Sequence, residues 1–402
     1  MTSSKRKSDF AVPEVEDFDS PHRLFSDLRS RCPVAYSDDL GGFWAVTRHE
    51  DICRVLTDWQ TFTTTVQNVV PPVATTQRRP PLHLDPPGNI PYRNAILRFL
   101  TPKRIEAWRP RIEKMVDRFL DPFVAKGGGD ICAEFSFVLP IALLAEFFGL
   151  DGEEAERIRT VGAEFNMALQ RQDLETLRAR SDELYSIAAG LIEDRKLNPR
   201  DPNSDPTASL LAVRVDGEAL PDALILGALR QFLLVGIIAP TTFIGSMAVH
   251  LARHPEHHGE IASSPDRIDI ALEELLRLYT PYRGFARTAR EDVELGGRMI
   301  RKGEALAVVF TSGNRDAELF PDPDTFRLDR KKPDLLTFGR GPHMCPGAPL
   351  ARLLLAVTLQ RIVTRTSRLE LTGEVEMTRW PEYGPLTVPL RVFPRTTEGE
   401  RL

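Results

Sequence analysis

The chain has 402 residues, 42% hydrophobic and 27% charged, a composition typical of a folded globular protein. Its net charge of −5 and isoelectric point near 6.0 exclude the basic footprint of a nucleic-acid-binding protein. The few cysteines contain no Cys-x-x-Cys spacing, so the sequence predicts neither a zinc site nor a disulfide framework and agrees with a reducing cytoplasm.

The N-terminal segment is polar, and no apolar signal segment follows Met1. Residues 1–19 are expected to form a flexible arm. Length alone predicts two or three domains for a chain of this size. Ser20-Pro21 marks the start of the first helix, because proline is well suited to the first turn.

The next part of the chain alternates short elements with one long loop. Residues 43–47 are aromatic and β-branched, which predicts a strand, residues 50–58 predict a short helix, and residues 62–66 an extended segment. Residues 67–91 contain many prolines and predict a long ordered loop, a feature that usually has a functional reason. An amphipathic helix is expected over 92–100.

Helices dominate the middle of the chain. Residues 105–195 predict several helices, split by Gly127-Gly128-Gly129 and by Pro140. Apolar residues recur every 3.6 positions over 171–195, as in an amphipathic helix, and residues 198–206 have the composition of a surface loop.

Residues 222–252 predict one very long helix that is apolar on nearly all sides. Its segment 232–249 carries no formal charge and reaches the length of a membrane span. Glycine, proline and threonine residues interrupt this segment, so a helix buried in the protein centre explains it better. Short strands and turns are expected to follow, for example at 293–297 and 306–310.

The segment from Phe338 to Gly347 reads Phe-Gly-Arg-Gly-Pro-His-Met-Cys-Pro-Gly. Its glycines and prolines predict a tight, pre-shaped loop around Cys345, with a helix directly behind it. Backbone N–H groups of such a loop and the positive end of the helix favour a thiolate. A thiolate held in this way is a suitable axial ligand for haem iron.

The pattern Phe-x-x-Gly-x-x-x-Cys-x-Gly, with His343 two residues before the cysteine, resembles the haem-binding loop of the cytochrome P-450 family. The resemblance implies instead that residues 20–402 form one triangular, mainly α domain with a minor β region. It implies haem b as cofactor, with Cys345 as iron ligand and Phe338, Gly339 and Gly347 at the cofactor. A buried structural thiol is the alternative for Cys345.

The same resemblance implies three partners for the haem propionates. Arg93 follows an Asp-Pro-Pro segment at the family spacing, and Arg287 and His343 match two further propionate positions. Buried carboxylates need such cationic or N–H partners. Asn89 stands where the family often has histidine. The alternatives are an ordinary helix or strand charge for each arginine and a turn residue for His343.

Glu274-Leu275-Leu276-Arg277 places an acid and a base three residues apart on one helix face. Alone this is a common surface motif, but ahead of the cysteine loop it resembles the Glu-x-x-Arg motif of the family, which has a structural role. Either Arg327 or Arg330 is expected as a third partner.

The long helix departs from the family pattern. Most P-450 monooxygenases carry an acid–alcohol pair there that relays protons to the oxygen site. Counting back from the end of the helix places Ile238 at the acid and Ala239 at the alcohol. A register two residues later would use Pro240-Thr241, which restores an alcohol but no acid. Residues 239 and 241 are about 200° apart on a helix and cannot both face the haem.

The catalytic candidates on this helix are therefore Gly236, Ile238, Ala239 and Thr242, with Thr242 one turn beyond Ile238. Pro240 is expected to open a kink and to free a carbonyl, because proline has no N–H. That carbonyl or a water is the predicted replacement for the missing relay.

Several stretches (62–71, 79–87, 236–240 and 380–384) look like the bacterial P-450 group whose members are often fused to a flavin and iron–sulfur reductase of the phthalate-dioxygenase type. The chain is then a stand-alone relative or the haem domain of such a fusion. By family position, the substrate contacts are expected to be Val69, Val70, Val235, Phe285 and Tyr383.

The implied function is oxidation of a small apolar or aromatic substrate by a cytoplasmic, monomeric haem-thiolate monooxygenase that binds no membrane. Electrons from NAD(P)H would arrive through a ferredoxin or a flavin–iron–sulfur reductase. Basic residues near the cysteine loop would attract an acidic donor, namely Arg98, Lys103, Arg104 and Arg340. The alternatives are a hydrogen-peroxide-driven peroxygenase or peroxidase, a non-hydroxylating biosynthetic oxidase, and a haem sensor without turnover.

Overall fold

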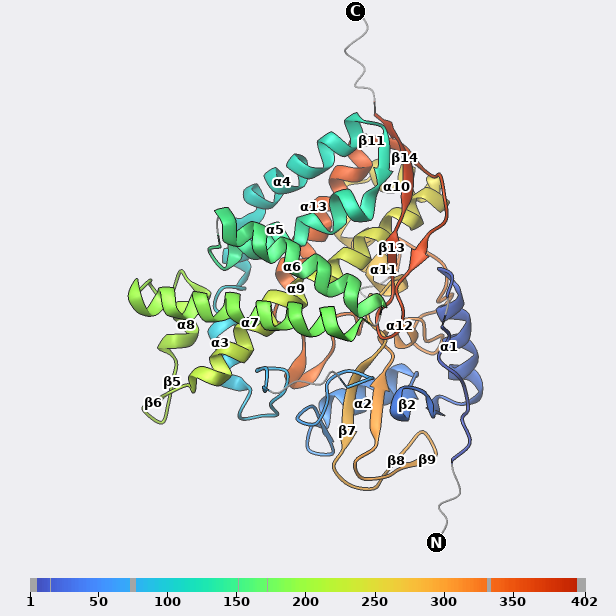
Figure 1. Ribbon diagram of the computed structural model, residues 1–402. Coiled ribbons are helices and arrows are strands. Elements are labelled where there is room, and N and C mark those ends of the chain that lie inside the picture. The colour runs from blue at the N-terminus through green and yellow to red at the C-terminus, as the bar shows by residue number, and fades with distance from the viewer. Residues whose placement is uncertain are drawn as a thin grey trace, which may run out of the picture.

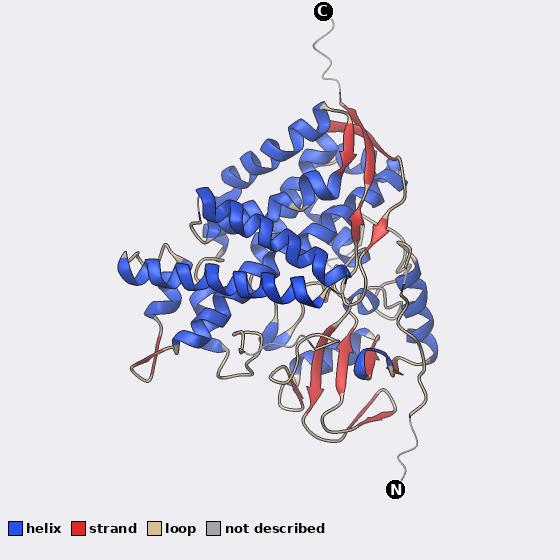
Figure 2. Ribbon diagram, viewed as in Figure 1, coloured by secondary structure: helices blue, strands red, loops and turns tan. Residues whose placement is uncertain are grey.

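The computed structural model describes residues 6–14, 16–72, 77–150, 152–171, 173–330 and 334–395. These residues are mainly helical, with a smaller share of strands in several separate sheets, which confirms the expected fold class (Figures 1 and 2). The α-helices are α1 (Ser20–Arg31), α2 (His49–Thr57), α3 (Ile90–Leu97), α4 (Pro102–Ala125), α5 (Val138–Phe147), α6 (Gly152–Arg171), α7 (Leu174–Leu197), α8 (Pro206–Ala212), α9 (Asp222–Arg253), α10 (Pro255–Ala262), α11 (Ile268–Leu278), α12 (Phe310–Gly313) and α13 (Ala348–Arg365).

The strands form one five-stranded sheet and several small ones. The large sheet has the order β1-β2-β10-β7-β3, in which β2 and β10 run parallel and the other neighbours antiparallel. A second sheet has the order β11-β14-β4, and three hairpin pairs are β12-β13, β5-β6 and β8-β9. The strands are β1 (Val34–Ser37), β2 (Phe43–Val46), β3 (Phe62–Thr63), β4 (Gly128–Asp130), β5 (Arg214–Val215), β6 (Glu218–Ala219), β7 (Phe285–Ala289), β8 (Val293–Leu295), β9 (Arg298–Ile300), β10 (Ala305–Val308), β11 (Thr366–Leu371), β12 (Glu376–Met377), β13 (Pro385–Thr387) and β14 (Pro389–Pro394).

Helix α9 runs through the centre of the helical part, where α5, α6, α7 and α13 contact it (Figure 1). Two glycines allow this close packing. A Cβ at Gly236 would lie 2.8 Å from the Leu144 side chain of α5, and a Cβ at Gly245 would lie 2.7 Å from Pro385. The apolar part of α9 is 78% buried inside the protein, so its hydrophobicity is that of a core helix.

Helix α9 is continuous across Pro240, the position at which the sequence predicts a kink. Proline still removes one helical N–H, so the carbonyl of Gly236 receives no hydrogen bond from position 240. Pro140 differs from its expected place, since it lies in the first turn of α5 rather than between two helices.

The N-terminal segment is packed where the structure describes it, in contrast to the expected flexible arm. Phe10 is 8% exposed, and its ring lies 5.9 Å from the ring of Phe43. Glu16 accepts a hydrogen bond of 2.7 Å from the buried Arg283 guanidinium. The apolar residues and the buried ion pair explain why a polar segment is held against the body of the protein.

Candidate active site

A cavity of about 830 Å³ lies between α9, the proline-rich loop and the loop that carries Cys345. Most of its lining is apolar. The lining brings together Arg93, Arg287, Phe338, Gly339, His343, Cys345 and Gly347, which the sequence assigns to the cofactor. Among the described lining residues there is no aspartate or glutamate. The remaining cysteines of the chain do not line the cavity.

The cysteine loop is closed by its own backbone. The Cys345 N–H donates to the Phe338 carbonyl at 2.8 Å, and the Gly339 N–H donates to the Leu336 carbonyl at 2.7 Å. Gly339 and Gly341 have φ angles of 69° and 70°, a region that favours glycine. A Cβ at Gly341 would also lie 2.7 Å from the Leu56 carbonyl oxygen. Both positions therefore require glycine, as the sequence predicts.

Burial raises the pKa of the Cys345 thiol. Hydrogen bonds from the Gly347 and Ala348 N–H groups and the positive charge of Arg93 act in the opposite direction. The predicted N–H donors are thus present, but they do not by themselves outweigh burial. A bound metal ion removes this difference, because a coordinating thiol is deprotonated outright.

Arg93 and Arg287 present positive charge to the cavity without an internal counterion. Arg287 is 4% exposed, and its guanidinium donates to the Ala286 carbonyl at 2.8 Å. Burial lowers the pKa of Arg287 to about 10 and also lowers the pKa of Arg93. Neither arginine forms an ion pair with any residue that the structure describes. Two such guanidiniums match a ligand that carries two carboxylates.

His343 is fixed by a carboxylate that the sequence analysis missed. Its Nε2 lies 3.3 Å from the Thr64 hydroxyl and 3.7 Å from Asp85 Oδ1, which leaves Nδ1 for a ligand. Burial raises the pKa of Asp85, but hydrogen bonds from His343, Thr63, Arg290 and the Thr64 N–H outweigh it and hold the pKa below its usual range. The Asp-Pro-Pro motif indicates only that Asp85 lies outside a regular helix, because the residue before a proline disfavours the helical conformation.

The wall formed by α9 has no acid and no alcohol at the cavity. Gly236, Ile238 and Ala239 line the cavity, whereas Thr241 and Thr242 do not. The Thr242 hydroxyl lies 3.2 Å from the carbonyl oxygens of both Ile238 and Ala239, so it can donate to either of them, and the Thr241 hydroxyl donates to the Ile237 carbonyl at 2.7 Å. This arrangement favours the register that places Ile238 and Ala239 at the acid and alcohol positions.

The expected substrate contacts divide into two groups. Val69, Val235 and Phe285 line the cavity, and the Phe285 ring lies 4.2 Å from the Tyr282 ring. Val70 and Tyr383 do not line it. Val70 is 1% exposed, and its side chain belongs to the apolar cluster that contains Phe25 and Phe43. The buried Tyr383 hydroxyl donates to the Phe18 carbonyl at 2.8 Å. Both have partners inside the protein, which explains why neither reaches the cavity.

Comparison with known proteins gives consistent matches. The family model "Cytochrome P450" matches residues 268–380. The chain is 32% identical to nocardicin C N-oxygenase of Nocardia uniformis, over 91% of each chain, and 28% identical to cytochrome P450 107B1 of Saccharopolyspora erythraea, over 92% of this chain and 94% of that one. The structure of Mycobacterium marinum cytochrome P450 CYP268A2 in complex with pseudoionone has a TM-score of 0.86 at 26% identity, over 96% of this chain and 100% of that one.

The chain belongs to the cytochrome P450 family. It is a haem-dependent oxidoreductase of the bacterial monooxygenase type, and the haem iron of this family is ligated by a cysteine thiolate. The cavity fits this cofactor. Cys345 is the cysteine that lines it. Arg287 is buried and Arg93 is half-buried, and neither guanidinium forms an ion pair among the described residues. Bound haem supplies the activation of oxygen, and the residues of this chain hold it and shape the space beside it.

Glu274 and Arg277 form the buried pair of this P450. The Arg277 guanidinium binds the Glu274 carboxylate through Nε at 2.9 Å and Nη2 at 2.8 Å, and both side chains are almost fully buried. The third partner is Arg330, whose Nε lies 3.1 Å from Glu274 Oε1. Arg327 contributes only its backbone N–H to Glu274, while its guanidinium pairs with Asp322 and Asp329. Of the two arginines that the sequence offered as third partner, the structure therefore selects Arg330.

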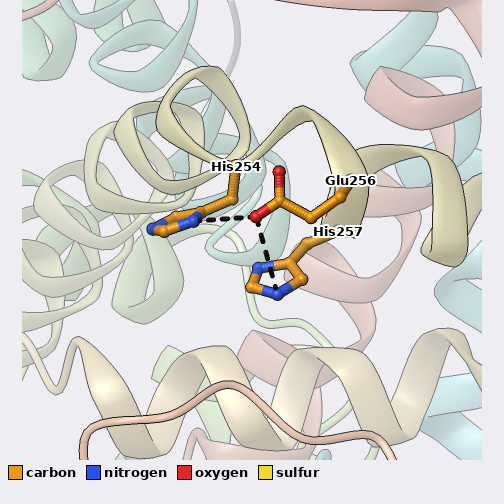
Figure 3. Close-up of side chains that lie close together, drawn as sticks. All are labelled: His254, Glu256 and His257. Atoms are coloured by element: carbon orange, nitrogen blue, oxygen red, sulfur yellow. Dashed lines mark hydrogen bonds and ion pairs between the residues drawn. The ribbon is translucent and has the colours of Figure 1, made fainter.

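A second group of metal-ligand types lies outside the cavity. His254, Glu256 and His257 meet at the start of α10, with His254 Nδ1 at 3.1 Å and His257 Nε2 at 4.0 Å from Glu256 Oε1 (Figure 3). His257 Nδ1 also lies 3.1 Å from His250 Nε2. Hydrogen bonding among these groups accounts for their arrangement, and none of them lines the cavity.

Proposed function

We propose that this P450 inserts one oxygen atom from O2 into a small substrate with an apolar or aromatic body, or O-dealkylates it. The second oxygen atom leaves as water, with two electrons from NAD(P)H and two protons. The mainly apolar cavity lining is the observation that carries the proposal. The proposed substrate contacts are Val69, Val235 and Phe285. The proposed cofactor contacts are Cys345, Arg93, Arg287 and His343. We also propose that residues 20–402 act as one cytoplasmic, monomeric haem domain.

The α9 wall supports a second candidate, a peroxygenase driven by hydrogen peroxide. Peroxide already carries the protons that an acid–alcohol pair would deliver, and no such pair lines the described part of the cavity. In the O2-driven candidate, the protons pass instead along a water held by the Gly236 carbonyl, which Pro240 leaves without its helical N–H donor.

One experiment separates the two candidates. The holoenzyme oxidises a small aromatic probe either with a ferredoxin, its reductase and NAD(P)H under labelled O2, or with unlabelled hydrogen peroxide alone. The monooxygenase proposal expects a faster first reaction with label in the product. Product from peroxide alone, with an inactive reductase reaction, would replace that proposal by the peroxygenase.

Replacing Ala239 by threonine tests the relay. We expect the ratio of product formed to NAD(P)H consumed to rise several-fold, because the hydroxyl would lie at the cavity wall. The gain should stay below the roughly 100-fold of a well-placed acid–base group, since the acid remains absent. Thr241→Ala is the matched control, because its hydroxyl bonds the Ile237 carbonyl away from the cavity. An unchanged ratio in Ala239→Thr would reject either the register or the relay.

We propose that an acidic ferredoxin binds near the cysteine loop. Of the four basic residues expected there, Arg98 and Lys103 are exposed. Arg104 donates to the Asn203 carbonyl at 2.6 Å, and Arg340 pairs with Asp334, so the charge available to a partner is smaller than the sequence implies.

Charge reversal at Arg98 or Lys103 is expected to slow reduction by an acidic ferredoxin several-fold at low salt. The effect should shrink above 0.1 M salt, where the screening length is about 10 Å. Stopped-flow reduction rates against salt concentration measure it. Arg368→Glu is the control, a charge reversal on β11, which lies beyond the end of α13 that is opposite to the cysteine loop. Equal slowing in the control variant, or no dependence on salt, would contradict this docking face.

A further inference from the structure

The cavity contains more positive charge than the cofactor accounts for. Arg93, Arg287 and His343 match the haem propionates, and Arg340 pairs with Asp334. The other arginines in the lining are Arg79, Arg178 and Arg379. Arg178 and Arg379 are exposed, whereas Arg79 is only 5% exposed. Since no carboxylate lines the described part of the cavity, the charge of Arg79 is not balanced from within its walls.

The guanidinium of Arg79 lacks acceptors. Its Nε is buried without a hydrogen-bond partner among the described residues. His83 Nδ1 accepts from the Arg79 backbone N–H, so the ring proton of His83 is on Nε2. His83 Nε2 donates this proton to Asn68 Oδ1 at 2.7 Å. Arg79 Nη2 lies 3.4 Å from the same Nε2, which therefore cannot accept from it. Burial, with Arg79 and Arg78 nearby, lowers the pKa of His83 to about 4, so this ring is neutral at pH 7. Arg79 therefore faces a donor where it needs an acceptor.

A second buried arginine lies behind the first. Arg230 of α9 is 1% exposed, and its Nε and Nη1 have no partner among the described residues. Its guanidinium lies over the rings of Phe165 and Tyr185, and Nη2 donates to the Ser181 hydroxyl at 3.0 Å. Burial and the charge of Arg79 lower the pKa of Arg230 to about 10. Two cations thus lie within electrostatic reach of each other, and no acidic residue acts on either of them.

The position of this pair relative to α9 is fixed by close packing. A Cβ at Gly227 would lie 2.1 Å from the Arg78 carbonyl oxygen, so the loop that carries Arg79 rests directly on α9 one turn before Arg230. Gln231 follows and lines the cavity. From Gln231 to Ile238 the helix advances by about 10 Å, at 1.5 Å per residue. The cationic end and the proposed reaction end therefore lie at separate points along one wall.

We propose that the cavity binds an amphipathic carboxylic acid, whose carboxylate pairs with Arg79 and whose apolar body extends along α9 toward Ile238 and Ala239. A carboxylate supplies the acceptors that the Arg79 guanidinium lacks, and its negative charge offsets part of the positive charge of Arg79 and Arg230. Arg230 acts on the bound anion through its charge from behind the lining. The prediction of which end of the acid is oxidised rests on the proposed monooxygenase function. The prediction that the acid binds does not.

Equilibrium binding to the holoenzyme tests the proposal, with decanoate, decanol and the decyltrimethylammonium cation as probes of equal chain length. Titration calorimetry should show decanoate binding at least tenfold more tightly than decanol, and no binding of the cation. This comparison uses only the unmodified protein and does not depend on turnover. Equal affinity for decanoate and decanol would overturn the proposal.

Variants then locate the contact. Arg79→Gln should weaken decanoate binding by roughly 10- to 100-fold, the loss typical of a charge-assisted hydrogen bond, and leave decanol nearly unchanged. Arg79→Lys should retain part of the preference. Arg157→Gln, which removes a cation paired with Glu183 outside the cavity, should change neither. If Arg79→Gln weakens decanoate and decanol equally, Arg79 only supports the fold.

The two proposals fail in different ways. If decanoate binds through Arg79 but neither oxidant yields product, the monooxygenase proposal fails and the acid site remains. If the aromatic probe is oxidised but decanoate has no advantage over decanol, the function remains and the acid site is wrong. Decanoate oxidised by the unmodified enzyme, with a raised KM and little change in kcat in Arg79→Gln, would support both.

Discussion

Replacing Cys345 by serine is expected to abolish product formation with either oxidant. A serine oxygen donates less electron density to iron than a thiolate sulfur does, and that donation assists cleavage of the O–O bond. The absorption band of the carbon-monoxide adduct of the reduced protein should also move to shorter wavelength. The loop itself should remain, because the Cys345 N–H still bonds the Phe338 carbonyl and the glycine conformations are unchanged.

Cys53→Ser is the matched control for this experiment. Cys53 is half-buried on α2, outside the cavity, and its sulfur lies 3.6 Å from His49 Nδ1. Both variants replace a cysteine sulfur by an oxygen. An unchanged spectrum and rate in Cys53→Ser would therefore show that the loss of activity in Cys345→Ser is specific to Cys345. A thiolate-type spectrum in Cys345→Ser would contradict the assignment.

The second large effect concerns the buried ion pair. Glu274→Gln should lower the free energy of unfolding by about 3–5 kcal/mol, because it leaves the Arg277 charge buried with only carbonyl acceptors. The Arg330 guanidinium loses its charged partner at the same time. The glutamine has nearly the same shape, so the effect reports charge rather than a cavity. Denaturant unfolding of the haem-loaded protein measures it, together with the fraction of protein that retains haem.

The preceding residue provides the control. Glu273 binds Arg352 at 2.5 Å, but both side chains remain partly exposed, at 23% and 40%. Glu273→Gln should therefore cost less than about 1 kcal/mol. A loss in Glu274→Gln no larger than in Glu273→Gln would show that the buried pair is not what holds this region.

The sequence contained enough to predict the cysteine loop and the long helix. The local signals are the glycines and prolines around the cysteine and the long uncharged segment 232–249, and the structure agrees with each of them. The resemblance carried Arg93, Arg287 and His343 to the cavity because the family spacing is retained. Arg330 could not be separated from Arg327, since both lie in one loop and only its path decides which guanidinium turns inward.

Other features depend on contacts that no local pattern records. Tyr383 and Val70 were assigned by family position, but each finds a partner inside the protein. Arg79 and Arg230 come from a loop and a helix far apart in the sequence. Only the folded structure shows that both guanidiniums have buried N–H groups without a hydrogen-bond acceptor among the described residues. The same holds for Asp85, whose neighbours come from three separate segments.

The unbroken course of α9 has a consequence for regioselectivity. If the carboxylate binds Arg79 as proposed and oxygen is delivered beside Ile238 and Ala239, α9 sets a fixed distance between the two points. The oxidised carbon would then be counted from the acid group of the substrate and not from its far end. For acids of different chain length, the proposed anchor selects the same carbon number, and additional methylene groups extend beyond the site of attack.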